Sequence, residues 1–154
     1  MSWLNDLISG VKWLQWKAIP RPDGTTIMWR FIIFECVLFA IWIHKFVHND
    51  QAWPHSHPRT ITSVLLWGNY RQETFQWSAD SDKVLSEAQR FYAGEINVVL
   101  PDTVHRIRGL KGPCWTLCFC GKVVQNWCFY APDTFERITP SKYFMSNGYP
   151  NWQE

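Results

Sequence analysis

Two histidines separated by a single serine, His55 and His57, are the residues of this chain best suited to chemistry. On a β-strand, side chains two residues apart project from the same face, because successive side chains alternate. Neutral imidazole is the most common metal ligand among protein side chains. A third histidine, His105, lies in a later segment that also has the character of a strand. Convergence of the three would form a mononuclear metal site.

The residues around the first pair resemble the first motif of the cupin superfamily, G-x5-H-x-H-x3,4-E-x6-G. Asn49 stands at the first glycine of the motif, and asparagine tolerates the left-handed backbone that glycine adopts readily. Gly68 stands at the last position. Ile61 occupies the position of the acidic metal ligand, so this chain departs from the motif there.

Residues 94–109 are similar to the second cupin motif, G-x5-P-x-G-x2-H-x3-N. Gly94 begins the match, and His105 stands at the histidine of the motif. Pro101 is displaced by one residue, Asp102 replaces the second glycine, and Gly109 replaces the asparagine. The two half-motifs together place all three histidines at cupin ligand positions.

Further segments resemble a small cupin-like family of bacteria and phages that has no settled activity. They are Ile43-His44, His55-Ser56-His57-Pro58, Gly68-Asn69-Tyr70, His105-Arg106, Trp115-Thr116-Leu117 and Trp127-Cys128-Phe129. The resemblance implies an all-β fold, a small cupin or double-stranded β-helix (jelly-roll) barrel. It also implies a homodimer, since cupins often pair through their sheets.

Without the acidic ligand, the resemblance implies a metal held by His55, His57 and His105 alone, as in the thiol dioxygenases, which are cupin enzymes that use Fe(II). The expected cofactor is a divalent metal, with Fe(II) favoured and zinc, manganese or nickel as alternatives. His44 or Asp102 is expected as a fourth ligand. The expected catalytic residues are Arg106, which would fix a substrate anion, and Tyr70, a hydroxyl in the pocket.

The elements that must position these residues are mostly strands. Alternation and turn residues predict strands at 26–33, 37–47, 60–67, 70–77, 96–100, 104–108, 115–120 and 123–130. Hairpin turns are expected at 67–70 and 120–123. The polar stretch 78–90 is expected to be a loop or a short surface helix.

The two ends of the chain are expected to lie outside the barrel. Apolar residues at helical spacing predict a helix over 3–16, followed by a turn at 21–24. The last part, 140–154, is expected to be irregular. The chain is therefore predicted to be a single domain, 1–154, with the helix and turn in 1–24 and the barrel in 25–139.

Composition excludes several classes of function. The net charge is only +2, with scattered basic residues, so no nucleic-acid signal is present. The longest apolar stretch is too short to span a membrane. The five cysteines and the absence of a signal peptide predict a reduced, cytoplasmic protein. Cys114, Cys118, Cys120 and Cys128 could form a zinc site, but strand parity favours buried free thiols.

Three functions are compatible with these patterns. The first is a mononuclear Fe(II) oxygenase acting on a small molecule. The second is a non-catalytic barrel that binds or sequesters a small ligand such as a nucleotide or sugar. The resemblance to phage proteins suggests that such a barrel could be phage-encoded. The third is a metal-free structural barrel. The expected partner in the first two cases is a small molecule.

Overall fold

The computed structural model describes residues 10–20, 24–50 and 52–147, and most of its regular structure is β-strand. The larger of two main sheets has six strands in the order β1-β2-β3-β9-β4-β7, and every neighbouring pair is antiparallel. Its strands are β1 (Lys12–Pro20), β2 (Thr26–Glu35), β3 (Ala40–Phe46), β4 (Ile61–Trp67), β7 (Ile96–Val99) and β9 (Cys114–Cys120).

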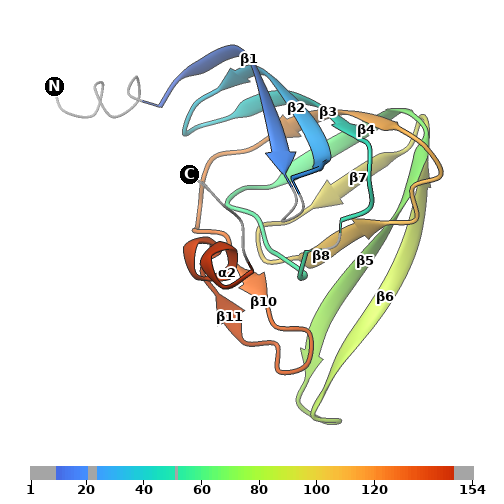
Figure 1. Ribbon diagram of the computed structural model, residues 1–154, viewed down its shortest axis with the longest axis vertical. Helices are drawn as coiled ribbons and strands as arrows, with labels where there is room; N and C mark the ends of the chain where they lie inside the picture. The colour runs from blue at the N-terminus through green and yellow to red at the C-terminus, as the bar shows by residue number, and fades with distance from the viewer. Residues whose placement is uncertain (1–9, 21–23, 51, 148–154) are drawn as a thin grey trace, which may run out of the picture.

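The second sheet has the order β6-β5-β8, with β5 (Asn69–Ser78), β6 (Lys83–Tyr92) and β8 (Val104–Arg108). The long hairpin of β5 and β6 extends well beyond the rest of the fold (Figure 1). His55 extends this sheet, because it forms single-residue bridges with His105 of β8 and with Phe129. Phe129 begins β10 (Phe129–Tyr130), which pairs with β11 (Arg137–Ile138) and is followed by α2 (Pro140–Ser146).

This arrangement is consistent with the expected jelly-roll fold, but its sheets are not closed into a barrel. Within the described ranges, no strand pairing joins the six-stranded sheet to the smaller one. The chain instead passes between the sheets at turns such as Gly68, which connects β4 to β5. The two sheets therefore enclose the interior by packing inner faces together rather than by continuous hydrogen bonding.

Alternation along each strand divides the six-stranded sheet into an inner and an outer face. In β9, Cys114, Thr116, Cys118 and Cys120 are buried, whereas the residues between them are more exposed. The inner face supplies a core cluster in which Cys118 and Cys120 pack with Trp42 and Ile61. All five cysteines are free and buried, which confirms the expectation of buried free thiols at Cys114, Cys118, Cys120 and Cys128.

The outer face of the same sheet carries an apolar row that crosses all six strands. Direct cross-strand neighbours join Trp16, Phe31, Ile43, Leu117, Val64 and Ile96 in that order. The residues at its two ends, Trp16 and Ile96, are 59% and 60% exposed. This outer apolar row is therefore a surface feature and not part of the core.

The predicted N-terminal helix is not supported. Residues 1–9 and the turn residues 21–23 lie outside the described part of the chain, and Lys12–Pro20 form an edge strand on β2. Cross-strand pairing with β2 outweighs the helical spacing of apolar residues, because local propensity is a weak preference beside tertiary contacts. The described residues contain no helix with the length and apolar character needed to cross a bilayer.

Four other expectations about the elements were wrong. The stretch 83–92 is a strand, and residues 140–146 of the tail form α2. The turn at 67–70 joins different sheets, so it is not a hairpin. No second hairpin forms after Cys120: the chain instead runs past β4, where Val124 donates a backbone hydrogen bond to the carbonyl of Pro58.

Candidate metal centre

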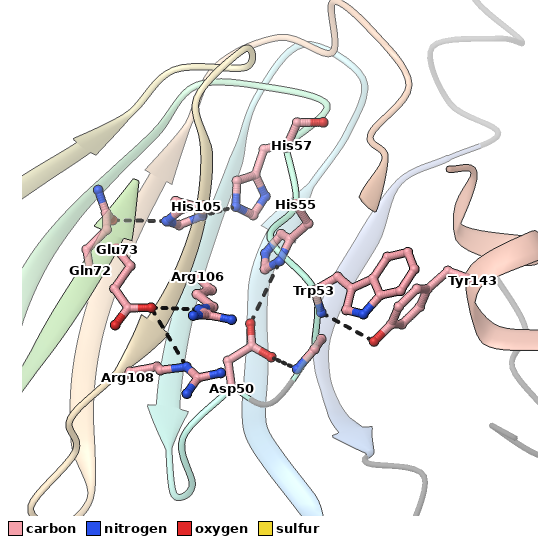
Figure 2. A network of polar contacts seen from close by, with 12 residues as sticks. Asp50, Trp53, His55, His57, Gln72, Glu73, His105, Arg106, Arg108 and Tyr143 are labelled. Carbon is pink, nitrogen blue, oxygen red and sulfur yellow. Dashed lines mark hydrogen bonds and ion pairs between the residues drawn. The ribbon is translucent and has the colours of Figure 1, made fainter. Parts of the chain in front are cut away.

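The three predicted histidines meet at one point. His55, His57 and His105 each offer a ring nitrogen, and these three nitrogens lie within 4.8 Å of one another (Figure 2). His55 and His105 are direct cross-strand neighbours, because each backbone N–H donates to the other's carbonyl at 2.9 and 3.0 Å. His57 lies on the same side of its segment as His55, and its Nε2 is 2.7 Å from Nε2 of His105.

The ring of His105 is oriented by a chain of amide contacts. Its Nδ1 lies 3.0 Å from Oε1 of Gln72, and an amide oxygen only accepts, so Nδ1 carries the proton. The Nε2 lone pair is then free to face His57. The same Oε1 accepts from Nδ2 of Asn97 at 2.7 Å, and that Nδ2 also lies 2.8 Å from the hydroxyl oxygen of Tyr70.

His55 has a different environment. Its Nδ1 is buried and has no hydrogen-bond partner among the described residues, where Oδ2 of Asp50 is a carboxylate oxygen 3.7 Å away. Buried polar atoms are nearly always satisfied, so this nitrogen needs an explanation. A metal bound through the other ring nitrogen would leave an Nδ1 proton facing Asp50, the carboxylate–histidine arrangement common at metal sites. The residues present therefore fit a metal ion.

The protonation states also fit. Burial lowers the pKa of His105 well below its ordinary value, and the positive charge that His55 can carry lowers it further. Burial lowers the pKa of His57 in the same way, assisted by the nearby rings of His105 and His55. Both imidazoles are neutral at physiological pH, which is the form that binds metals.

A cavity of about 640 Å³ lies between the two sheets, and all three histidines are on its wall. Trp42 and Phe46 of β3 line it together with Tyr70 of β5. His57 is half-buried and borders this cavity. The cluster is therefore positioned to meet a small molecule inside the fold.

Neither residue expected as a fourth ligand joins the cluster. His44 of β3 lines the cavity, but its Nε2 accepts from Nε of Arg30 at 3.0 Å and its Nδ1 lies 3.5 Å from Sγ of Cys118. Asp102 is exposed in the turn before β8. Ile61, at the position of the motif's acidic residue, lines the cavity with an apolar side chain.

The two residues expected to be catalytic have different positions. Tyr70 is fully buried on the cavity wall, and burial raises the pKa of its hydroxyl. Arg106 follows His105 on β8, so alternation directs it to the opposite face. There its Nε donates to Oε2 of Glu73 at 2.7 Å, away from the histidines (Figure 2).

Sequence reasoning missed four residues around the site: Arg30, Asp50, Gln72 and Asn97. Gln72 shares the inner face of β5 with Tyr70, since they are two residues apart. Arg30 lies within the apolar strand β2, two residues from the buried Ile32. A polar residue in phase with buried apolar residues is the signal that could have identified both.

Comparisons with known proteins show the fold. Neither the protein-family models nor the curated protein sequences give a match. An RmlC-like cupin from Shewanella frigidimarina superposes with a TM-score of 0.53 at 11% identity, over 73% of this chain and 86% of that one. The DMSP lyase DddQ from Ruegeria pomeroyi superposes with a TM-score of 0.55 at 14% identity, over 77% and 62%.

A third solved structure, Fe(II)-HppE with an alternative substrate, gives a TM-score of 0.54 at 10% identity, over 75% of this chain and 62% of that one. These similarities establish that the chain has the cupin, or double-stranded β-helix, fold, as the motifs predicted. In this chain the fold places a three-histidine cluster on the wall of a cavity.

Proposed function

We propose that this protein is a cupin-type metal protein in which His55, His57 and His105 hold one divalent metal ion, with Fe(II) favoured. The observation that supports this proposal is the convergence of their three ring nitrogens within 4.8 Å on the cavity wall. Imidazole nitrogen suits iron, zinc, nickel and copper ions, so zinc and nickel are the alternatives that fit the donor set best.

The proposed activity is oxygen-dependent oxidation of a small molecule. An Fe(II) ion with three protein ligands would supply redox chemistry and open coordination positions for dioxygen and substrate. The chain's own contribution is positional. Gln72 fixes the tautomer of His105 through the contact at Nδ1, and Trp42 and Phe46 give the cavity an apolar wall that limits the access of water.

The fold neighbours are consistent with this proposal and do not select the reaction. One is described with Fe(II), another is a DMSP lyase, and an oxalate decarboxylase from Lactobacillus farciminis superposes with a TM-score of 0.52. Oxidation is proposed here because the ligand set, three neutral nitrogens and no carboxylate, resembles that of the thiol dioxygenases.

A non-catalytic barrel that binds or sequesters a small ligand, such as a nucleotide or sugar, is the second candidate function. The volume of the cavity, about 640 Å³, favours it, because small-molecule sites commonly enclose about 300–1,000 Å³. Co-purification of a stoichiometric ligand without oxygen consumption would identify this function in place of the first.

Metal analysis of the protein purified without a histidine tag tests the proposal. We expect about one equivalent of divalent metal after anaerobic loading with Fe(II), and loss of binding in His55→Ala and His105→Ala. His48→Ala is the matched control, since the His48 ring contacts the Thr26 carbonyl and not the cluster. Absence of metal in the wild type, or full retention in both cluster variants, overturns the proposal.

We also propose that the protein is cytoplasmic. The five free cysteines support a reducing compartment, where thiols stay unpaired. Fractionation of the native cells, with the chain detected by antibody, tests this location.

A further inference from the structure

The cavity wall contains a positively charged side chain that is not part of the histidine cluster. Arg30 of β2 lines the cavity, and its guanidinium lies over the ring of Trp42 at 4.1 Å. Its Nε donates to Nε2 of His44 at 3.0 Å. Burial lowers the pKa of His44 well below its ordinary value, so this imidazole is neutral. It accepts the hydrogen bond of Arg30 and contributes no charge of its own.

No carboxylate of the described residues pairs directly with Arg30, although the charge of Glu35 acts on it through space. Glu35 of the same strand is engaged by Nζ of Lys12 at 2.8 Å and by Nε1 of Trp42 at 2.9 Å. Burial lowers the pKa of Arg30, and arginine nevertheless keeps its proton in proteins. The cavity wall therefore holds a half-buried guanidinium that no acidic side chain in the described part of the chain contacts directly.

A second cation lies directly beside it. The strand register pairs Lys17 of β1 with Arg30, and both side chains line the cavity. Like charges directly opposite on neighbouring strands destabilise a sheet. Burial lowers the pKa of Lys17, and the charge of Arg30 lowers it further. An anion bound at Arg30 would also be attracted by the charge of Lys17.

We propose that the cavity binds a small organic carboxylate whose anionic group contacts Arg30 and whose apolar body extends along Trp42 toward the three histidines. The Nε of Arg30 is used by His44, which leaves the two Nη nitrogens. A guanidinium presents such a pair of donors in a fork that matches a carboxylate. Ile27, Phe46 and Val99 supply the apolar wall around the body of the ligand. Arg30 is then the residue that determines specificity.

This inference deepens the proposed function and rests on it for the end of the ligand that would react, but anion binding can be measured without metal. Benzoate is the probe, because it combines a carboxylate with an apolar ring. We expect the metal-free protein to bind benzoate, detected by calorimetry, and to bind benzamide, the neutral analogue of similar shape, roughly tenfold or more weakly.

Variants locate the binding. Arg30→Gln should weaken benzoate binding roughly ten- to a hundredfold, and Arg30→Lys should retain part of it. Arg106→Gln is the matched control, because that arginine pairs with Glu73 on the opposite face and should leave the affinity unchanged. Equal binding of benzoate and benzamide by the wild type overturns the inference and needs no variant to fold.

The same samples separate this inference from the proposed function. Metal binding without a preference for benzoate over benzamide overturns the carboxylate site and leaves the metal site standing. Arg30-dependent benzoate binding in a protein that takes up no metal supports the carboxylate site and overturns the metal-dependent activity. Equal loss of benzoate affinity in Arg30→Gln and Arg106→Gln would assign the effect to general charge and overturn the inference.

Discussion

Gln72 controls which nitrogen of His105 is available to a ligand. Its side-chain oxygen contacts Nδ1 of the ring and is itself held by Asn97. Outer contacts of this kind orient metal-binding histidines and make them more basic. The order of the contacts, from Asn97 to Gln72 to His105, links strand β7 to the histidine cluster through β5 and β8.

Gln72→Leu is expected to weaken metal binding roughly ten- to a hundredfold, because Nδ1 of His105 loses its acceptor and the ring loses its orientation. Competition with a chromophoric chelator measures the affinity. Gln76→Leu, at an exposed position further along β5, is the matched control and should match the wild type. Equal affinity in the Gln72 variant would show that the contact does not orient a metal ligand.

The buried histidines predict how stability depends on pH in the metal-free protein. Burial lowers the folded-state pKa of His44, His57 and His105 below the unfolded value. The free energy of unfolding is therefore unaffected by these histidines above about pH 6.5, the unfolded pKa. It decreases as the pH falls from there toward the lowered folded-state pKa values, because only the unfolded chain takes up protons in that range.

Each histidine adds a slope of up to about 1.4 kcal/mol per pH unit in that window. Urea unfolding at a series of pH values from neutral to mildly acidic measures it, and His105→Gln should reduce the slope by one histidine's share. A free energy of unfolding that stays constant below pH 6.5 would contradict the burial of neutral imidazoles.

At the scale of the elements, the turn between β4 and β5 requires glycine at position 68. Gly68 has φ +82°, and a Cβ atom there would lie 2.7 Å from the Pro113 carbonyl oxygen. Gly94 has φ +90° with nothing within 4 Å of the same position. The two glycines share the left-handed backbone and differ in the space around them.

Gly94→Ala is expected to cost about 1–2 kcal/mol of unfolding free energy, from the left-handed backbone alone. Gly68→Ala should cost at least about 1 kcal/mol more, because the added methyl group meets rigid backbone. Denaturant unfolding of both variants beside the wild type measures the difference. Equal losses would mean that the turn shifts freely away from Pro113.

How far the sequence predicted the elements depended on burial. Strands with one buried face, such as β4 and β9, show clean alternation and were found. Strand β6 was missed because it is exposed along nearly its whole length and pairs only with β5, so no face requires apolar residues. Helix α2 was missed, although Pro140 at its first turn is a recognised start signal.

For the site, the sequence predicted the three histidines but not the side chains that contact them. The i, i+2 pair and its motif spacing identified the three histidines, because parity and ligand chemistry are local properties of the sequence. The partners of those histidines were not, because Gln72 and Asp50 reach the cluster through cross-strand contacts and a loop. Parity alone could have excluded Arg106, which cannot share a face with its neighbour His105.

At the scale of the whole molecule, the outer apolar row leaves one sheet face without a cover in the described structure. Five strand spacings and a seven-residue strand give this face a footprint of about 24 by 23 Å. A stable interface needs about 800 Å² of accessible surface from each partner, which a face of this size with protruding side chains can supply. A second copy of the chain, which presents the same apolar sheet face, is the partner whose chemistry matches.

We therefore expect a homodimer through this face, measured by sedimentation velocity. Ile96→Glu, at a 60% exposed position in the row, should shift the protein to monomer. Leu85→Glu on β6, at 44% exposure in the other sheet, is the matched control and should remain dimeric. A wild-type protein that sediments as a monomer at high concentration would contradict the expectation.

The reciprocal backbone bonds between His55 and His105 have a consequence for hydrogen exchange. Any local opening that exposes these two amides to exchange also separates two of the three side chains proposed to hold the metal. A bound ion then opposes that opening with its own binding free energy, and exchange at both amides slows accordingly. The two amide protons thus form a built-in reporter of metal occupancy, readable by exchange spectroscopy before any substrate is known.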